Sequence, residues 1–520
     1  MSFTRKLFPT TALALLSIFA AGIAHWCMSS DISVTPDSTV YLSAADRLVE
    51  GKGLTPIGYH FSPAIPSDRP LVIFPPAYSL LLASTSLFTN DRLAGAKYLH
   101  SFLFAANIFL LGLIVYISSG SIWPALCAMA LFQTSYPLLS IYTMARAEPL
   151  FMLFLLATLL GVVLYTREER LWILLVCAGL AAAALMARYA AITILLPLVL
   201  IVLIQKGVSR RSFKRAVLVG GVALLPLVAW VIRNRLIAGS STERSLAFHL
   251  IGTAAVRTFV DSLMLLFTPY SLPGVVKLLL LTIASVVVVR ALWMGLRGQS
   301  STANRCVRFF SAVMVATYAI FIAAYNSFAN PLVDYGPRVV LPVYIFGMIL
   351  VFSLVECESA VGKRRILFWG IVFSSLVLFG ANVRPAAYWM SYRHREGEGF
   401  TSRAWKDSET VKFLKALPPQ TVIYSNAADA CYSLTKREVL RLPAKYDSTL
   451  GRNNGDFDAQ MTALRDGLKN NHALVIYFDR INWRWYLPTR NELEDLYQLP
   501  VATRLADGIV YGVQPATLQH

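Results

Sequence analysis

Charged residues and cysteines are both scarce in this chain, and each shortage excludes a class of protein. Only 15% of the 520 residues are Asp, Glu, Lys or Arg, whereas a soluble globular domain carries about 25%. The six cysteines are scattered and form no CxxC or Cys/His spacing, so they predict neither a disulfide framework nor a cysteine zinc site. No glycine-rich nucleotide fingerprint and no internal repeat is present. A soluble enzyme and a disulfide-rich scaffold are therefore excluded.

Apolar residues take the place of the missing charges, since they make up 56% of the chain and give a mean hydropathy of +0.57. A membrane-spanning helix needs about 20 such residues in succession. We therefore predict a polytopic α-helical membrane protein with about eleven transmembrane helices. The expected spans are 7–28, 94–118, 122–141, 148–165, 171–187, 189–205, 216–232, 274–296, 309–326, 339–356 and 366–385.

The net charge of +18 is unevenly distributed and predicts the topology. Residues 386–520 hold 17 basic and 15 acidic residues, which leaves 30 basic and 14 acidic residues in the first 385. Lys and Arg gather in cytoplasmic loops, so we expect a cytoplasmic N-terminus and an external C-terminal tail. The basic clusters then lie inside at Arg167 and Arg170; Lys206, Arg210, Arg211, Lys214 and Arg215; Arg297, Arg305 and Arg308; and Lys363, Arg364 and Arg365. Nucleic acid is not an expected partner.

The first apolar run has a second interpretation. Gly22 and Ala24 offer a small-residue cleavage site, so the run could be a signal peptide. Its length and the many spans that follow favour a retained helix.

The spans divide the chain into two domains. Residues 1–385 are expected to form the transmembrane domain, with a first external loop at about 29–93 and a second at 233–273. Residues 386–520 predict a soluble α/β domain with an accessory or acceptor-recognition role. Its expected elements are helices at 408–417 and 459–469, strands at 421–425 and 473–479, a segment at 491–499 and a closing pair near 503–513.

The first external loop opens with a predicted amphipathic helix. Thr35 is a suitable N-cap, Pro36 a suitable first residue and Gly51 or Gly53 a suitable end. One apolar face is formed by Val40, Tyr41, Ala44, Ala45, Leu48 and Val49, so the helix is expected to lie on the membrane. Asp37 falls in its first turn, where a carboxylate can also simply complement the helix dipole. The spacing leaves both interpretations of Asp37 open.

Further ionisable residues are expected at the outer membrane face. Glu148 stands at the end of a span, where such a group is a functional candidate. Its alternatives are an ordinary acid at a helix start or an ion pair with Arg146. Arginines on the same side can be snorkelling residues, or they can hold a phosphate together with nearby tyrosines. These residues are Arg188, Arg233, Arg235 and Arg338, with Tyr41, Tyr189 and Tyr335.

The order of these features resembles the GT-C class of membrane glycosyltransferases. The features are one span, the pattern D-S-x-x-Y from Asp37, F-P-P-x-Y at 74–78, Glu-Pro at 148–149, R-Y at 188–189, W-x-x-R-N from Trp230, R-x-x-L-P from Arg338 and a soluble tail. The similar branch contains bacterial relatives of protein O-mannosyltransferases and lipid A aminoarabinose transferases, and the resemblance covers about residues 8–385.

The resemblance implies a GT-C fold and a function. Such enzymes transfer a sugar from a polyprenyl-phosphate-linked donor to a lipid, glycan or protein acceptor, usually with inversion. The site faces the periplasm, so the resemblance places this chain in the bacterial inner membrane. Enzymes of this class do not use a nucleotide-linked donor.

Site residues follow from the resemblance position by position. Asp37 matches the first-loop catalytic carboxylate and would act as general base. Glu148 matches the second acidic position, where relatives often have Asp-Pro, and would position the acceptor or an ion. The donor phosphate would be held by Arg338, Arg188, Arg233 and Tyr335.

We expect no cofactor and no obligatory metal, because the loop has no second acid adjacent to Asp37. Some members of the class need a divalent cation, and His60 with Asp68 could form a loop site for one. The competing functions are a transporter or lipid flippase, which would show matching halves with broken helices, and a non-catalytic polysaccharide-assembly subunit. In the latter, Asp37 would only cap its helix.

Overall fold

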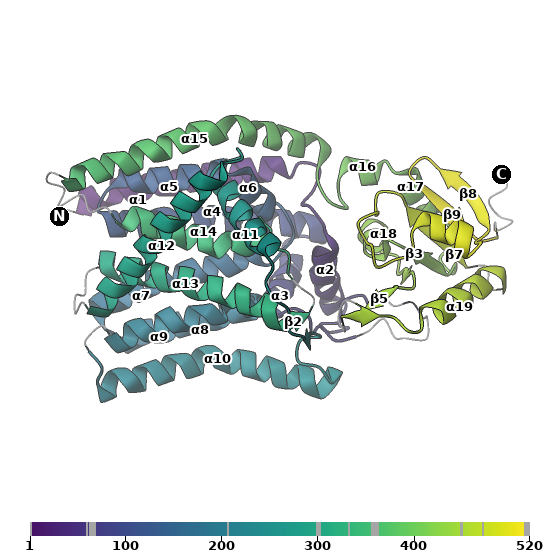
Figure 1. Cartoon of the computed structure of the whole chain (residues 1–520), viewed down its shortest axis with the longest axis horizontal. Coiled ribbons are helices and arrows are strands. Elements are labelled where there is room, and N and C mark those ends of the chain that lie inside the picture. Colours follow the sequence, from purple (N-terminus) through teal and green to yellow (C-terminus); the bar gives the residue numbers. More distant parts are fainter. Residues whose placement is uncertain are drawn as a thin grey trace.

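The computed structural model describes residues 3–58, 61, 69–204, 207–297, 303–330, 333–354, 363–447, 451–470 and 473–513. Figure 1 shows two parts along the long axis of the molecule, a bundle of long helices and a smaller part that contains the main sheet. Helix α2 lies at the end of the bundle that faces the smaller part.

The helices of the bundle follow the predicted ranges in order. They are α1 (Phe3–Cys27), α4 (Arg92–Ser119), α5 (Ile122–Thr134), α6 (Tyr136–Tyr142), α7 (Glu148–Glu168), α8 (Leu171–Ala187), α9 (Leu195–Ile204), α10 (Arg210–Ala238), α12 (Gly274–Arg297), α13 (Ala303–Phe328), α14 (Pro337–Ser353) and α15 (Lys363–Glu396). Two predicted spans are interrupted. A 72° bend separates α5 from α6, and the 3-10 helix η2 (Tyr189–Ile194) precedes α9.

Seven described helices are long and apolar enough to cross a membrane, or eight if the bent pair α5–α6 is one span. Helices α8 and α14 have 17 residues each. Such a helix is roughly 25 Å long, a little less than a bilayer core of about 30 Å. The chain is therefore a membrane protein with several spans, and the remaining spans of the predicted eleven stay a prediction.

The outer helices expose their apolar side chains. Helix α12 presents Val275, Leu278, Val286 and Val289 on its surface, each more than half exposed. Helices α4 and α7 instead bury most of their apolar residues inside the bundle. An exposed apolar surface of this extent is unfavourable in water and favourable in lipid.

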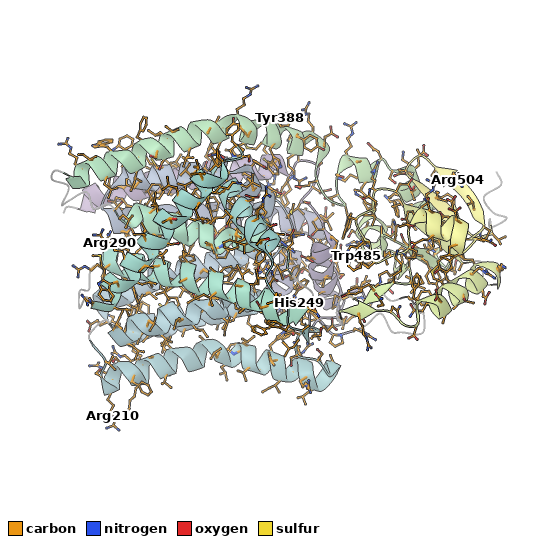
Figure 2. All side chains as sticks on the ribbon, viewed as in Figure 1. Arg210, His249, Arg290, Tyr388, Trp485 and Arg504 are labelled. Atoms are coloured by element: carbon orange, nitrogen blue, oxygen red, sulfur yellow. The ribbon has the colours of Figure 1, made fainter. Side chains whose placement is uncertain are left out.

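Basic residues gather at the end of the bundle that lies away from the sheet. Figure 2 shows Arg210 and Arg290 at that end, where α10 begins and α12 ends. Helix α7 carries Arg167 in its last turn, and Arg170 follows it in the connection to α8. These basic residues therefore lie at the same end of the bundle.

The loop between α1 and α4 contains the predicted amphipathic helix, α2 (Pro36–Val49), followed by α3 (Ala77–Ser84) and the 3-10 helix η1 (Thr85–Leu87). The Thr35 hydroxyl caps α2 by accepting a hydrogen bond from the amide of Ser38. The apolar face of α2 packs on the following segment, where Tyr41 stacks on Phe74. Its polar face contacts the C-terminal part through Thr39, Asp46 and Arg47. The predicted amphipathic helix is therefore confirmed, and its place on the membrane surface stays a prediction.

The loop between α10 and α12 contains elements that the sequence did not predict. A two-residue strand β1 (Ser245–Leu246) pairs antiparallel with β2 (Ala329–Asn330). Helix α11 (Thr253–Phe267) follows and buries Leu263, Met264 and Leu266. Its Phe259 ring meets the edge of Tyr335, so α11 covers the segment before α14.

The smaller part is the predicted α/β unit. Its main sheet has the order β4-β3-β7-β9-β8, in which β3 is parallel to β4 and β7 and the other neighbours are antiparallel. The strands are β3 (Ile423–Ser425), β4 (Leu440–Arg441), β7 (Leu474–Phe478), β8 (Val501–Leu505) and β9 (Gly508–Tyr511), with a hairpin of β5 (Tyr446–Asp447) and β6 (Arg452–Asn453).

The helices of this part are α16 (Arg403–Lys406), α17 (Glu409–Ala416), α18 (Ala428–Thr435), α19 (Phe457–Asn470) and a π-helix, Glu492–Leu496. Strands β3 and β7 are buried throughout. Helix α15 continues to Glu396, so the predicted division at 385 falls inside it.

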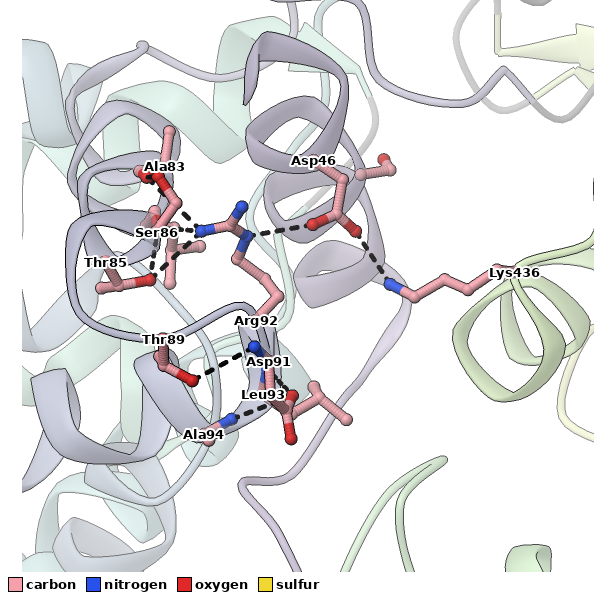
Figure 3. A network of polar contacts seen from close by, with 12 residues as sticks. Asp46, Ala83, Thr85, Ser86, Thr89, Asp91, Arg92, Leu93, Ala94 and Lys436 are labelled. Carbon is pink, nitrogen blue, oxygen red and sulfur yellow. Dashed lines mark hydrogen bonds and ion pairs between the residues drawn. The ribbon is translucent and has the colours of Figure 1, made fainter. Parts of the chain in front are cut away.

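Ion pairs join the smaller part to α2. Figure 3 shows Asp46 of α2 between Arg92 and Lys436, at 2.9 and 2.8 Å. Arg47 pairs with Glu438 at 2.7 Å, and the Thr39 hydroxyl lies 2.8 Å from that of Ser433. Helix α2 is thus held on one face by the bundle and on the other by α18 and the residues after it.

Candidate active site

Three short segments meet at the end of the bundle next to the α/β part and set the position of the site. Ser33 and Val34 form parallel bridges with Met144 on one side and Gly399 on the other. The Ser33 amide donates to the Thr143 carbonyl at 2.9 Å, and the Phe400 amide donates to the Val34 carbonyl at 2.8 Å. The middle segment leads directly into α2, so its anchoring fixes where Asp37 lies.

Asp37 lies in the first turn of α2 and pairs with two arginines. Its Oδ2 atom is 2.6 Å from Nη1 of Arg338, the second residue of α14. The same oxygen is 4.0 Å from Nη2 of Arg146, whose guanidinium also donates to the Thr35 hydroxyl at 2.9 Å. About a third of the Asp37 side chain is exposed, 36%, so a bound molecule can reach its carboxylate.

Glu148 is the first residue of α7, and only 3% of its side chain is exposed. It forms an ion pair with Arg188, which stands between α8 and η2. Its Oε1 atom is also 4.0 Å from Nη1 of Arg338. Glu148 therefore holds the arginines rather than facing a ligand itself.

The two carboxylates and three arginines form one cluster, with Arg338 between Asp37 and Glu148. Arg146 and Arg188 complete it, so three positive and two negative charges leave one net positive charge. Arginines are well suited to bind phosphate because their planar donors match its oxygens. The cluster therefore has the charge balance of a site for an anion.

Tyr41 forms the wall beside this cluster. Its ring stacks on Phe74 and meets the edge of Tyr78, and burial raises the pKa of Tyr41 well above its usual range. The phenol therefore stays protonated at neutral pH and can act only as a neutral hydrogen-bonding group. The motif at 74–78 thus packs against α2 through Phe74 and Tyr78.

The structure brings together four of the six predicted site residues and leaves two apart. Arg233 donates to the Leu71 carbonyl at 2.9 Å and lies over the Trp230 ring. Tyr335 is buried against Phe259. Within the described part of the chain, no hydrogen bond or ion pair links Arg233 or Tyr335 to Asp37 or Glu148.

Arg146 belongs to the cluster although the sequence suggests it only as a partner of Glu148. The Arg146 guanidinium donates its hydrogen bonds to Thr35 and lies near the Asp37 carboxylate. Arg338 also lies closer to Asp37 than to Glu148. The signal that could have indicated this role is its place two residues before a buried helix-start acid. Pairing with Asp37, 109 positions earlier, depends on the bridge between Ser33 and Met144.

Among the described residues, no group of three or more His, Cys, Asp or Glu side chains is placed to hold a metal ion. His60 and Asp68, which the sequence suggests as a loop site, lie outside the described residues.

A second polar feature lies at the other end of α2. A cavity of about 500 Å³ adjoins the ion pairs of Figure 3 and is lined by residues of α2, the start of α4 and the segment after α18. Its charged groups include Arg47, Glu50, Asp91 and Glu438. The cavity is separate from the cluster around Asp37, because Asp37 does not line it.

Comparison with known proteins identifies the fold. No protein-family model matches the chain, and no curated protein matches it in sequence. In three dimensions the chain has the GT-C fold of membrane glycosyltransferases, as the resemblance predicted.

Two of the similar solved structures are of ArnT from Cupriavidus metallidurans. The one bound to undecaprenyl phosphate has a TM-score of 0.55 and 13% identity, covering 99% of each chain, and the apo form has a TM-score of 0.56, 13% identity and 98% coverage of each. A third is the Archaeoglobus fulgidus oligosaccharyltransferase tethered to an acceptor peptide, with a TM-score of 0.57, 11% identity and coverage of 92% of this chain and 70% of that one. At such identities the similarity concerns the fold.

Proposed function

We propose that the chain is an integral membrane glycosyltransferase that transfers a sugar from a polyprenyl-phosphate-linked donor to a lipid, glycan or protein acceptor. The observation that carries this proposal is the exposed Asp37 carboxylate set against Arg338 and Arg146 at one end of a GT-C bundle. The bound undecaprenyl phosphate of the similar ArnT structure supports the class of donor.

Asp37 acts as the general base in this proposal. An acceptor hydroxyl attacks the anomeric carbon of the sugar, and its proton passes to the Asp37 carboxylate. The bond between that carbon and the phosphate oxygen breaks, and its electron pair leaves with the polyprenyl phosphate. One direct displacement of this kind inverts the anomeric centre. Asp37 is favoured over Glu148 as the base because 36% of its side chain is exposed, against 3% for Glu148.

The arginines stabilise the leaving phosphate. Negative charge grows on the phosphate oxygen as the bond breaks, and cations already in place lower the free energy of that transition state. Arg338 is the central group, because it lies near both carboxylates. When its guanidinium binds the donor phosphate, its ion pair with Asp37 weakens, and the Asp37 carboxylate is free to contact the attacking hydroxyl. Donor binding therefore prepares the base.

Glu148 and Arg188 have a supporting role. The buried Glu148 carboxylate holds Arg188, whose side chain is 27% exposed, and so directs a cation towards the phosphate. Arg146 contributes the third charge from the other side of Asp37.

The membrane is the bacterial inner membrane in this proposal, with the N-terminus in the cytoplasm and the C-terminal α/β part in the periplasm. The basic end of the bundle supports this orientation, because Lys and Arg favour the cytoplasmic side. The candidate site lies at the opposite end, next to the α/β part, and so would face the periplasm.

The test compares envelope lipids, glycans and proteins by mass spectrometry from cells that make the wild type or Asp37→Asn at equal abundance. Glu50→Gln is the matched control, since Glu50 follows the other end of α2 and pairs with Lys52. We expect one defined sugar mass to disappear only with Asp37→Asn. Unchanged glycoconjugates in that variant would refute the proposed function for the detected products.

A further inference from the structure

The connection between α15 and the α/β part contacts the candidate site directly. Residues 397–401 form a turn, here called the linker turn, that packs on residues 30–34. The Thr401 hydroxyl donates to the Ile32 carbonyl at 2.6 Å, and the Phe400 amide donates to the Val34 carbonyl. Gly399 has a φ of +65°, and a Cβ atom there would clash with the Val34 carbonyl. The close approach therefore requires glycine.

Glu398 is the acidic residue of this turn, between Gly397 and Gly399. Its Oε2 atom is 3.6 Å from Nε of Arg393 and accepts a hydrogen bond from the Ser140 hydroxyl at 3.5 Å. Both contacts are long. The carboxylate therefore keeps most of its hydrogen-bonding capacity free, and 37% of the side chain is exposed.

Arg393 holds the Glu398 carboxylate in place and leaves part of its hydrogen-bonding capacity free. Only 1% of its side chain is exposed, and one of its nitrogens donates to the Thr143 carbonyl at 3.2 Å. In the part of the chain that the structure describes, its Nε and Nη1 atoms have no hydrogen-bond partner. Buried polar atoms normally have partners, so two guanidinium nitrogens without a hydrogen-bond partner beside a partly exposed carboxylate indicate a place for another polar group.

Electrostatics connects Glu398 with the cluster around Asp37. Burial raises the pKa of Glu398, while Arg393 and Arg146 oppose this effect. Arg146 is also the residue that bonds Thr35 and approaches Asp37. Glu398 thus lies within the electrostatic reach of Arg146, beside the end of α6 that carries Ser140.

We propose that Glu398 is an acceptor-binding residue, whose carboxylate accepts a hydrogen bond from a hydroxyl or ammonium group of the acceptor while Asp37 takes the proton of the attacking hydroxyl. This inference rests on the proposed function. A cationic or hydroxyl-rich acceptor group is favoured because Glu398 is the carboxylate outside the three-arginine cluster, whereas the donor phosphate is anionic and belongs with the arginines.

The test uses the purified full chain with two probes. The first is undecaprenyl phosphate, whose Kd reports the donor-phosphate site. The second is an envelope extract from cells that lack the chain, which supplies donor and acceptor, and whose half-saturating amount is measured by the sugar mass added. We compare Glu398→Gln and Glu398→Asp, with Glu396→Gln as the matched control two residues away.

Glu398→Gln should raise the half-saturating amount of extract about 10-fold or more, the effect of losing one hydrogen bond to a charged group. Its Kd for undecaprenyl phosphate should stay within about twofold of the wild type, because no arginine of the cluster changes. Glu398→Asp should recover part of the loss, since it keeps the charge, and Glu396→Gln should behave as wild type.

Wild-type saturation in Glu398→Gln, or an equal loss of undecaprenyl phosphate affinity, would overturn the inference. If Glu398→Gln does not fold, Glu398→Asp decides, because its shorter side chain should still raise the half-saturating amount with the Kd unchanged. Failure of the proposed function is a different result. In that case the wild type itself adds no sugar mass to the extract.

Discussion

Asp37→Asn separates the two roles that the structure gives to this carboxylate. The amide keeps the size of the side chain but cannot accept the proton of an attacking hydroxyl. General base catalysis contributes about 10²–10⁴-fold, so we expect kcat for sugar transfer to fall by that factor. The helix should persist, because its cap is the Thr35 hydroxyl.

The same substitution should strengthen binding of the leaving group. Asp37 and Arg338 are 2.6 Å apart, but 36% of each side chain is exposed, so solvent screens their attraction. A pair of this kind stabilises by about 0.5–1 kcal/mol. Asparagine releases Arg338 from that attraction, and undecaprenyl phosphate should therefore bind about 2–5-fold more tightly, since 1.4 kcal/mol is a factor of about ten.

Both quantities can be measured on the purified chain in lipid nanodiscs. Binding of undecaprenyl phosphate is followed by native mass spectrometry, and transfer is followed with envelope extract as substrate. Glu50→Gln should change neither quantity. Weaker binding in Asp37→Asn would refute the competition between Asp37 and phosphate for Arg338, and full transfer would refute the role as base.

Three further substitutions test other parts of the arrangement. Arg338→Ala should weaken undecaprenyl phosphate binding about 10-fold or more, while Arg233→Ala, which lies apart from the cluster, should leave the Kd within about twofold; equal effects would contradict the placement of the phosphate site. Glu148→Ala should lower the free energy of unfolding by about 3–5 kcal/mol, because Arg188 loses its buried partner. Thermal unfolding of this variant is compared with that of Glu168→Ala, whose side chain is exposed, and equal melting temperatures would argue against the pair. Asp46→Asn should lower the free energy of unfolding by about 1–3 kcal/mol, because Arg92 and Lys436 lose their common partner. Proteolysis of the linker turn should then be faster, and an unchanged rate would show that these pairs do not hold the α/β part.

The helices of the bundle could be predicted because each corresponds to an apolar run in the local sequence. The breaks within them depend on packing and on the backbone. Ser135 takes an extended conformation between α5 and α6, and Pro137 restarts the helix after it. Helix α11 was missed because an amphipathic helix in a loop has no long apolar run to mark it.

The site was only partly predictable for a different reason. Asp37, Glu148, Arg188 and Arg338 could be named from their order in the resemblance, and the structure brings them together. Their pairing could not be named, because it joins segments that are distant in sequence, with 40 positions from Glu148 to Arg188 and 301 from Asp37 to Arg338. The nearest charge to Arg146 along the chain is Glu148, yet the short bridge of Ser33 to Met144 brings Arg146 to Asp37.

Helix α2 connects the candidate site with the contact to the α/β part, because one helix carries Asp37 at its start and Asp46 near its end. Catalytic geometry must be held to within about 0.5 Å, and a helix of 14 residues that lay on the membrane with one free face could rock by more than that. In this chain Arg92 holds the Asp46 end from the bundle and Lys436 holds it from the α/β part. The C-terminal part therefore contributes to the position of Asp37 through Lys436, which follows Asp46 by 390 residues. Its removal should impair transfer even when the cluster of arginines stays intact.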